Sequence, residues 1–177
     1  MLYQQRQFND PLHDLVQEHL IGKKDLIGIE IGSYRGESAD IFLRSKSFKT
    51  FFCIDPWEEG YDKNDEAASS EIIYAEKEFD ERFENNKVIQ KIKMSSNEAV
   101  NMFEDESIDF IYIDGNHQYE YVKNDIINYY SKIKKGGIIA GHDFNDNWLG
   151  VKKAVNEFFK KNPLKVYRDS SWIFYKN

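Results

Sequence analysis

Apolar residues along this chain follow two alternating patterns. Short runs rich in β-branched and aromatic residues are typical of buried strands. These runs are residues 26–31, 50–54, 88–92, 108–113 and 138–141. The segments between them carry apolar residues at helical spacing. They predict helices near residues 39–42, 69–84, 97–103, 119–130 and 151–159. Because strands and helices alternate, we predict an α/β fold with a mostly parallel sheet covered by helices on both faces.

The two ends of the chain predict further elements. A first helix is expected from apolar residues at helical spacing, namely Leu12, Leu15, Val16 and Leu20. Asn9 or Asp10 is its candidate cap, Pro11 its first position and Gly22 its end. We expect this helix to pack against the sheet or to help close a site. The whole chain, residues 1–177, is expected to form a single domain with residues 1–24 as a helical extension.

The last third of the chain departs from the strand–helix alternation. Residues 165–167 and 172–175 read as a closing hairpin, which makes the last strand antiparallel. Residues 134–137, Lys-Lys-Gly-Gly, predict a turn before the fifth strand.

Composition favours a folded globular protein, since 41% of the residues are hydrophobic and 15% are aromatic. The net charge of −7 argues against nucleic acid as a partner, because phosphate binding needs a basic face. The one cysteine, Cys53, lies in an apolar run and is expected to be a small core residue. No apolar run is long enough to span a membrane, and residues 1–11 are polar. We therefore expect a cytoplasmic protein that does not bind membranes.

Candidate chemistry gathers where the 108–113 strand ends. That strand stops at Asp114, and Gly115, Asn116 and His117 follow before the next helix opens near Tyr119. In open α/β sheets, ligands bind at the carboxyl ends of the strands, which makes Asp114 and His117 candidate functional residues. The fifth strand repeats the arrangement with His142 and Asp143. The alternative interpretations are a tight turn at Asp114, a helix-start role for His117 and a core position for His142.

The first two strands end in residues suited to a nucleoside ligand. The first strand ends on Glu30 and is followed by a turn with Gly32, Ser33 and Gly36, which lets the backbone approach a ligand closely. Only two glycines are present, so the turn departs from the dinucleotide-binding fingerprint. A plain strand–helix turn is an equal alternative.

Asp55 ends the second strand, a position suited to binding the hydroxyls of a ribose. Pro56 and Trp57 follow it. Residues 58–66 are mostly charged and form either a lid or a solvated connector. Four aromatic residues are candidates for an acceptor pocket or for the core, namely Trp57, Tyr119, Tyr121 and Trp148.

Taken together, these motifs resemble those of the class I S-adenosylmethionine-dependent methyltransferases. The resemblance covers about residues 26–175 and implies a Rossmann-like, doubly wound sheet with an antiparallel last strand. It implies that Ser95 and Ser96, after the third strand, contact the adenine, and that Asp55 binds the ribose. The full set of cofactor-binding residues implied is Glu30, Gly32, Ser33, Gly36, Asp55, Pro56, Trp57, Ser95, Ser96 and Asp114.

A narrower resemblance is to small O-methyltransferases, including metal-dependent enzymes that methylate sugar hydroxyls of macrolides. It implies that Asp114, His142 and Asp143 hold a divalent metal, and that Asp114 and His117 are catalytic, with His117 as the base. His142 stands where that branch has an acid. Magnesium prefers oxygen ligands, and a histidine ligand suits manganese, iron or zinc better.

The sequence thus predicts methylation of a small hydroxylated acceptor of the sugar or natural-product type, with S-adenosylmethionine as cofactor and with or without a metal such as magnesium. A nucleotide-binding oxidoreductase and a non-catalytic protein of the same fold are the alternatives. The missing third glycine argues against the oxidoreductase. A homodimer is also expected, in which a partner copy completes an open pocket.

Overall fold

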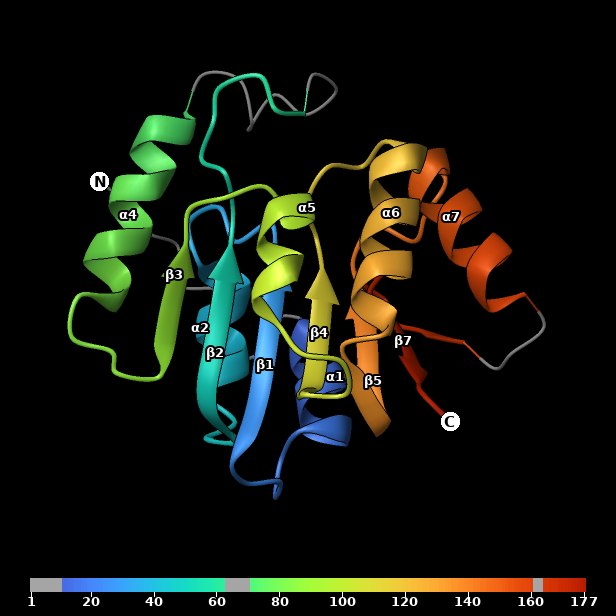
Figure 1. Ribbon diagram of the computed structural model, residues 1–177, viewed down its shortest axis with the longest axis horizontal. Helices are drawn as coiled ribbons and strands as arrows, with labels where there is room; N and C mark the ends of the chain where they lie inside the picture. The colour runs from blue at the N-terminus through green and yellow to red at the C-terminus, as the bar shows by residue number, and fades with distance from the viewer. Residues whose placement is uncertain (1–10, 63–70, 161–163) are drawn as a thin grey trace.

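The computed structural model describes residues 11–62, 71–160 and 164–177. Seven strands form one sheet in the order β3-β2-β1-β4-β5-β7-β6 (Figure 1). The strands are β1 (Leu26–Ile31), β2 (Phe48–Ile54), β3 (Ile89–Ile92), β4 (Ile108–Ile113), β5 (Ile133–Gly141), β6 (Lys165–Val166) and β7 (Trp172–Tyr175). The first five strands pair in parallel, β7 is antiparallel to β5, and β6 is antiparallel to β7. The predicted sheet and closing hairpin are confirmed.

Strand register brings four strand ends to one level. Ile31 at the end of β1 pairs with Ile54 of β2 and with Ile113 of β4, and Ile113 pairs with Gly141 of β5. The chain leaves β1 towards β2 on one side, and β4 pairs on the other side. Ligands bind at such a switch point in open α/β sheets. The register therefore places the loops after β1, β2, β4 and β5 side by side, above the arrowheads in Figure 1.

Helices cover both faces of the sheet, as predicted (Figure 1). They are α1 (Leu12–His19), α2 (Glu37–Leu43), α4 (Ile72–Phe83), α5 (Ser96–Ala99), α6 (Tyr119–Tyr130) and α7 (Leu149–Phe159). Apolar residues of α1, α2 and α4 form one core against the sheet, and those of α5, α6 and α7 form a second core on the other face. The strands are buried on both sides, which explains their nearly continuous apolar runs. Cys53 is buried in β2, as expected.

Two helices begin or end at other residues than the sequence predicts. The expected helix 97–103 begins at Ser96, is α-helical only to Ala99 and continues as a 3₁₀ turn, Val100–Met102. At the first helix, Pro11 occupies the N-cap and not the first helical position, and it gives no side-chain cap. Residues 9 and 10, the candidate caps, lie outside the described residues, as do residues 63–66 of the predicted lid and residues 69–70 of the predicted helix 69–84.

The Lys-Lys-Gly-Gly segment is part of a strand, and the predicted turn is wrong. β5 runs through it, and the register with β4 slips there, since Ile108 pairs with Ile133 and Phe110 pairs with Ile138. Gly136 has a φ of +74° and donates its N–H to the carbonyl oxygen of Lys176 at 2.7 Å. The glycine pair therefore produces an irregular bend within the strand, where a sequence pattern alone suggests a chain reversal.

The helix α1 is joined to the β6–β7 hairpin by polar contacts. The His19 ring lies between two tyrosines, with Nδ1 2.7 Å from the Tyr175 hydroxyl and Nε2 2.5 Å from the Tyr167 hydroxyl. Ion pairs join Glu18 to Lys165, and Asp14 to Arg168. Segments from opposite ends of the described chain thus lie together on one face.

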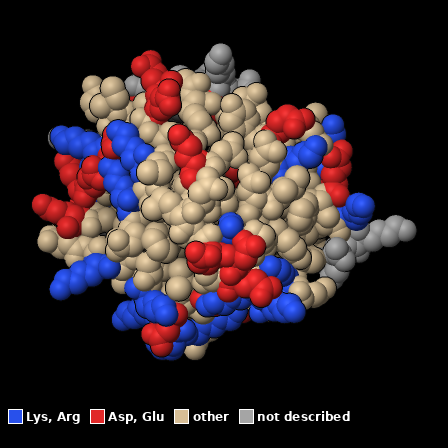
Figure 2. Space-filling view, viewed as in Figure 1, with Lys and Arg blue, Asp and Glu red and all other residues tan. Residues whose placement is uncertain are grey.

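The face shown in Figure 2 is mostly uncharged at its centre, while Lys and Arg side chains are interspersed with Asp and Glu on its left side and along its lower part. In the described part of the chain, no helix has the length and apolar character that crossing a membrane requires.

Candidate active site

A cavity of about 560 Å³ opens at the carboxyl ends of β1, β2, β4 and β5. Most of the residues singled out in the sequence line it, namely Gly32, Ser33, Asp55, Pro56, Ser96, Asp114, His117, His142 and Asp143. Tyr121 and Trp148 also line it. Four predicted cofactor residues lie outside its lining, namely Glu30, Gly36, Trp57 and Ser95, and so does Tyr119, a candidate pocket residue. The sheet register therefore brings the candidate cofactor and catalytic residues to one space.

The turn after β1 depends on its two glycines. Gly32 has a φ of +86°, and a Cβ there would lie 2.1 Å from the carbonyl oxygen of Asp114. Gly36 has a φ of +75°, and its Cβ would lie 2.4 Å from the ring of Phe83. Only glycine fits such positions. Gly32 thus allows the β1 turn to contact the β4 loop, and Gly36 allows it to contact α4.

Glu30 is fully buried behind this turn. Its Oε1 accepts a hydrogen bond from the Ser38 hydroxyl at 2.6 Å, while its Oε2 has no hydrogen-bond partner among the described residues. Burial raises the pKa of Glu30 to about 7. A buried carboxylate oxygen of this kind needs a donor from water or from a ligand. Glu30 therefore fits a supporting role beneath the cofactor loop.

Asp55 holds the loop after β2 and faces the cavity. Its two carboxylate oxygens accept the backbone N–H groups of Tyr34 and Trp57 at 2.9 and 2.7 Å. Burial raises its pKa. Each carboxylate oxygen keeps a second lone pair, so the group still has acceptor capacity for ligand hydroxyls.

Trp57 has a structural role in the same loop. Its indole N–H donates to the carbonyl oxygen of Tyr34 at 2.8 Å, and its ring packs on Phe79. The Trp57 side chain is 4% exposed and belongs to the core, as one of its predicted roles had it, and it does not line the cavity as a cofactor or acceptor-pocket residue would.

The two serines after β3 have different contacts. Ser95 caps α5 and exchanges hydrogen bonds with Glu98 in a capping box. Ser96 lines the cavity, and its hydroxyl donates to Asp125 Oδ1 at 2.5 Å. Burial raises the pKa of Asp125 to about 7. The sequence analysis missed Asp125, because an acid inside an amphipathic helix carries no distinguishing signal.

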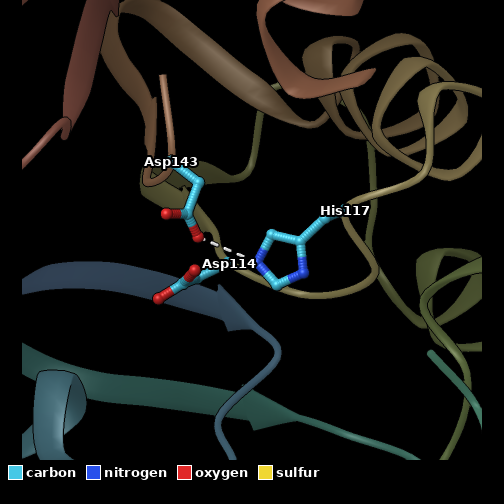
Figure 3. A group of neighbouring side chains, drawn as sticks. All are labelled: Asp114, His117 and Asp143. Atoms are coloured by element: carbon cyan, nitrogen blue, oxygen red, sulfur yellow. Dashed lines mark hydrogen bonds and ion pairs between the residues drawn. The ribbon is translucent and has the colours of Figure 1, made fainter. Parts of the chain in front are cut away.

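Asp114, His117 and Asp143 converge at one wall of the cavity (Figure 3). One atom of each residue that could ligate a metal ion, a carboxylate oxygen or a ring nitrogen, lies within 4.8 Å of the other two. The Nε2 of His117 lies 2.8 Å from Asp143 Oδ2, the contact drawn as a dashed line. His142 joins the same group, because its Nδ1 lies 3.3 Å from Asp143 Oδ2 and 3.8 Å from Asp114 Oδ1.

The carboxylates set the protonation of both histidines. Burial alone lowers the pKa of His117, but the hydrogen bond to Asp143 and the charges of Asp114 and Asp143 raise it to about 9. The same balance raises the pKa of His142 to about 9. Burial raises the pKa of Asp143, but hydrogen bonds from the two histidines outweigh it and hold that pKa well below its usual range. Without a metal, two imidazolium rings therefore neutralise this acidic site.

Two further residues contact His117. Asp62, from the loop after β2, is 4% exposed, and its Oδ2 accepts the backbone N–H of His117 at 2.8 Å. The Trp148 ring stacks on the imidazole, with the ring centroids 4.0 Å apart and the planes 21° apart. Trp148 was a candidate pocket residue. Asp62 was missed, since it lies in a charged segment where no pattern separates it from its neighbours.

Comparisons with known proteins identify the family of the chain. Residues 29–144 match a family model described as a methyltransferase domain. The chain is 34% identical over 160 residues to an uncharacterized protein of Acanthamoeba polyphaga mimivirus; the match covers 82% of this chain and 66% of that protein. This chain therefore spans about two thirds of the length of that relative.

Solved structures share the fold. The O-methyltransferase NovP has a TM-score of 0.66 at 17% identity, with 94% of this chain and 76% of that chain covered. A putative methyltransferase from Streptococcus mutans in complex with SAH has a TM-score of 0.65 at 17% identity, with 94% and 97% covered. A putative caffeoyl-CoA O-methyltransferase from Staphylococcus aureus has a TM-score of 0.60 at 16% identity, with 92% and 78% covered.

The family match extends from β1 through the loop after β5 and so includes the glycine turn, Asp55, Asp114, His117 and Asp143. The chain belongs to the methyltransferase-domain family and is a class I S-adenosylmethionine-dependent methyltransferase.

Proposed function

We propose that this enzyme transfers a methyl group from S-adenosylmethionine to a hydroxyl oxygen of a small neutral acceptor, with His117 as the general base. The observation that supports this proposal most directly is the group formed by Asp114, His117 and Asp143. It lines the same cavity as Gly32 and Asp55, the candidate cofactor residues. A base and carboxylates next to a bound sulfonium are what methylation of a hydroxyl requires.

The reaction requires the protein to remove one proton, that of the acceptor hydroxyl. S-adenosylmethionine supplies an electrophilic methyl group on a positively charged sulfur. The acceptor oxygen would bond to that methyl carbon as the carbon–sulfur bond breaks, and the hydroxyl proton would pass to Nε2 of His117 in its neutral form. An alcohol is a poor nucleophile at neutral pH, so removal of the proton and close positioning supply most of the acceleration.

We also propose that a divalent cation assists. Asp114 and Asp143 would hold it with the imidazole of His142, whose Nδ1 lies beside both carboxylates, and His117 would remain the base. Such a cation would neutralise the carboxylates and so lower the pKa of the remaining histidine. Two carboxylates and an imidazole are a mixed oxygen and nitrogen set, which suits manganese, iron or zinc better than magnesium.

The charge of the cavity favours a neutral acceptor. Eight acidic residues line it, namely Glu37, Asp55, Glu58, Asp62, Asp114, Asp125, Asp143 and Asp169. Among its described lining residues, Arg35 is the one arginine or lysine, and it pairs with Glu71 and Glu78. A phosphorylated acceptor or a coenzyme A thioester would be repelled here. Sugars and other polyols avoid this repulsion, and their hydroxyls can donate to the carboxylates.

Two measurements test the proposal. A panel of neutral sugars and catechols, with amine analogues of the same compounds, would be incubated with S-adenosylmethionine and assayed for S-adenosylhomocysteine release. We expect turnover with hydroxyl compounds; transfer to amines alone would contradict the assignment. Calorimetric titration with Mn²⁺ is expected to show binding that Asp143→Asn abolishes. Asp146→Asn is the matched control, because Asp146 lies exposed on the same loop and pairs with Lys152.

The homodimer expected from the sequence stays a prediction. A mass measured in solution over a range of protein concentrations tests it, and a monomer throughout would contradict it.

A further inference from the structure

We infer that Asp125 of α6 recognises the adenine of S-adenosylmethionine by accepting a hydrogen bond from the 6-amino group of the base. This inference rests on the cofactor of the proposed function and is independent of the acceptor. The sequence analysis gave Asp125 no role, and the proposed reaction does not use it. Its burial in the wall of the cofactor cavity therefore needs a separate explanation.

The carboxyl of Asp125 is buried and only half paired. Asp125 is 4% exposed and lines the cavity. Its Oδ1 accepts the hydroxyl hydrogen of Ser96 at 2.5 Å, while Oδ2 has no hydrogen-bond partner among the described residues. A buried carboxyl without its full set of hydrogen bonds destabilises the fold, so it calls for a donor from water or from a ligand. The amino group of a bound base is such a donor.

The position of Asp125 agrees with the order of the parts of the cofactor. Along the sheet, the strand ends follow the order β5, β4, β1, β2, β3 (Figure 1). His117 and Asp143 follow β4 and β5, Asp55 follows β2, and Ser96, the partner of Asp125, follows β3. In S-adenosylmethionine, the ribose lies between the reacting sulfonium and the adenine. A sulfonium beside His117 and a ribose at Asp55 therefore direct the adenine towards Ser96 and Asp125.

Two tyrosines give this part of the cavity a surface for a flat base. Tyr61, after β2, and Tyr121, on α6, both line the cavity, and their rings pack edge-on with the centroids 5.8 Å apart. Burial, and next the charge of Asp125, raises the pKa of Tyr61 to about 12, in keeping with its place near that carboxyl. Any purine can stack on an aromatic ring. The tyrosines thus contribute affinity, and the choice among purines falls to Asp125.

The choice depends on the kind of hydrogen bond that the base makes at position 6. Adenine carries an amino group there, which donates, whereas hypoxanthine carries a carbonyl oxygen, which only accepts. An ionised carboxylate has acceptors only. An amino group therefore satisfies Oδ2 of Asp125, while a carbonyl oxygen in the same place leaves Oδ2 unpaired and repelled. A site built to accept a hydrogen bond from its ligand rejects an analogue that lacks the donor.

The test compares two ligands that differ only at this position. S-adenosylhomocysteine and its deaminated analogue, S-inosylhomocysteine, would be titrated calorimetrically without metal or acceptor. A pH of about 8 keeps the Asp125 carboxyl mostly ionised, since its pKa is about 7. We expect the wild type to bind S-adenosylhomocysteine about 10- to 100-fold more tightly than the analogue. Equal binding of the two ligands, or no binding of either, would overturn the inference.

Variants at two acids of α6 assign this preference to its residue. Asp125→Asn keeps an oxygen for the Ser96 hydroxyl and places an amide N–H towards the ligand, so we expect the preference to fall by about tenfold or more. Glu120→Gln removes an exposed charge from the same helix and should keep the wild-type ratio of affinities. If Asp125 only linked α6 to Ser96, Asp125→Asn would weaken both ligands alike. An unchanged ratio in that variant would thus refute the inference.

The outcomes separate this inference from the proposed function. Should no hydroxyl compound be methylated, the proposed function fails, while the ratio of affinities still tests Asp125, because the titrations contain no acceptor. Should Asp125→Asn not fold, Asp125→Ala takes its place, since it removes the buried carboxyl altogether. That variant is expected to bind the two ligands equally, and a ratio as high as that of the wild type would refute the role of Asp125.

Discussion

The backbone of Gly32 lies against the carbonyl oxygen of Asp114, so close that a Cβ on Gly32 would be 2.1 Å from that oxygen. This contact joins the cofactor turn after β1 to the catalytic loop after β4. Gly32→Ala must therefore push the two loops apart and also place an alanine at a φ of +86°. We expect a loss of more than about 4 kcal/mol of stability, or failure to fold, measured by urea unfolding.

Gly22→Ala is the matched control for this change. Gly22 has the same φ of +86°, but no atom of the residues that the structure describes lies within 4 Å of a Cβ built on it. That variant isolates the backbone strain, which costs about 1–2 kcal/mol. Equal losses for the two variants would mean that the contact with Asp114 has no cost of its own.

Asp55 is predicted to bind the cofactor. Asp55→Asn keeps an acceptor oxygen for one backbone N–H but removes the negative charge that ribose hydroxyls would contact. We expect S-adenosylhomocysteine to bind about 10- to 100-fold more weakly by calorimetry, in keeping with a hydrogen bond to a charged group. Asp40→Asn, in the exposed pair with Arg44 of α2, serves as the control and should bind as the wild type does.

The serines after β3 provide a third prediction. Ser95→Ala should lower stability by about 0.5–2 kcal/mol, because it removes the cap of α5, and should leave S-adenosylhomocysteine affinity unchanged. Ser96→Ala should weaken that affinity, since Ser96 and its partner Asp125 line the cavity. The opposite result would place the adenine at Ser95, which the sequence resemblance gives, together with Ser96, as a contact of the adenine.

Stability should depend on pH through the two active-site histidines. Their pKa values are raised from 6.5 to about 9 by Asp143 and Asp114, against the effect of burial. A histidine with a raised pKa contributes its full stabilisation of the fold below about pH 6.5, and this contribution is lost as the pH rises through about 9. In chelator-treated protein, we expect the melting temperature to decrease as the pH is raised from about 6.5 to about 9.

His142→Gln should reduce the slope of this profile, because it removes one of the two groups that release a proton. Saturating Mn²⁺ should reduce it as well, if the cation takes the place of the imidazolium protons beside the carboxylates. A melting temperature that stays level across this range in chelator would show that the histidines are not held in their charged form.

The fold was predictable because strands that are buried on both faces of the sheet have nearly continuous apolar runs. The strands β1 and β4 are covered by helices on each side, and their apolar runs matched the observed bounds. The prediction failed where one residue pattern serves two structures. Lys-Lys-Gly-Gly suits a turn, yet the bend at Gly136 stays within β5, because the backbone pairs with Lys176.

The site was predictable only at the strand ends. Asp55, Asp114 and Asp143 follow apolar runs, and the register of a parallel sheet then brings them together. Asp62 has no such position. Its partner His117 lies 55 residues away, and the contact depends on the path of a loop. Asp125 is hidden for the same reason, since its partner Ser96 lies on another helix.

The contact of His19 with Tyr167 and Tyr175 has a consequence for local unfolding. It ties α1 to the β6–β7 hairpin, and both segments supply cavity wall, through Leu12 and through Asp169. Separating them breaks two hydrogen bonds to the buried His19 ring and at least two ion pairs. The amide protons of α1 and of the hairpin should therefore exchange with solvent as one cooperative unit. A change that loosens one of the two segments is then expected to open the cavity at both Leu12 and Asp169.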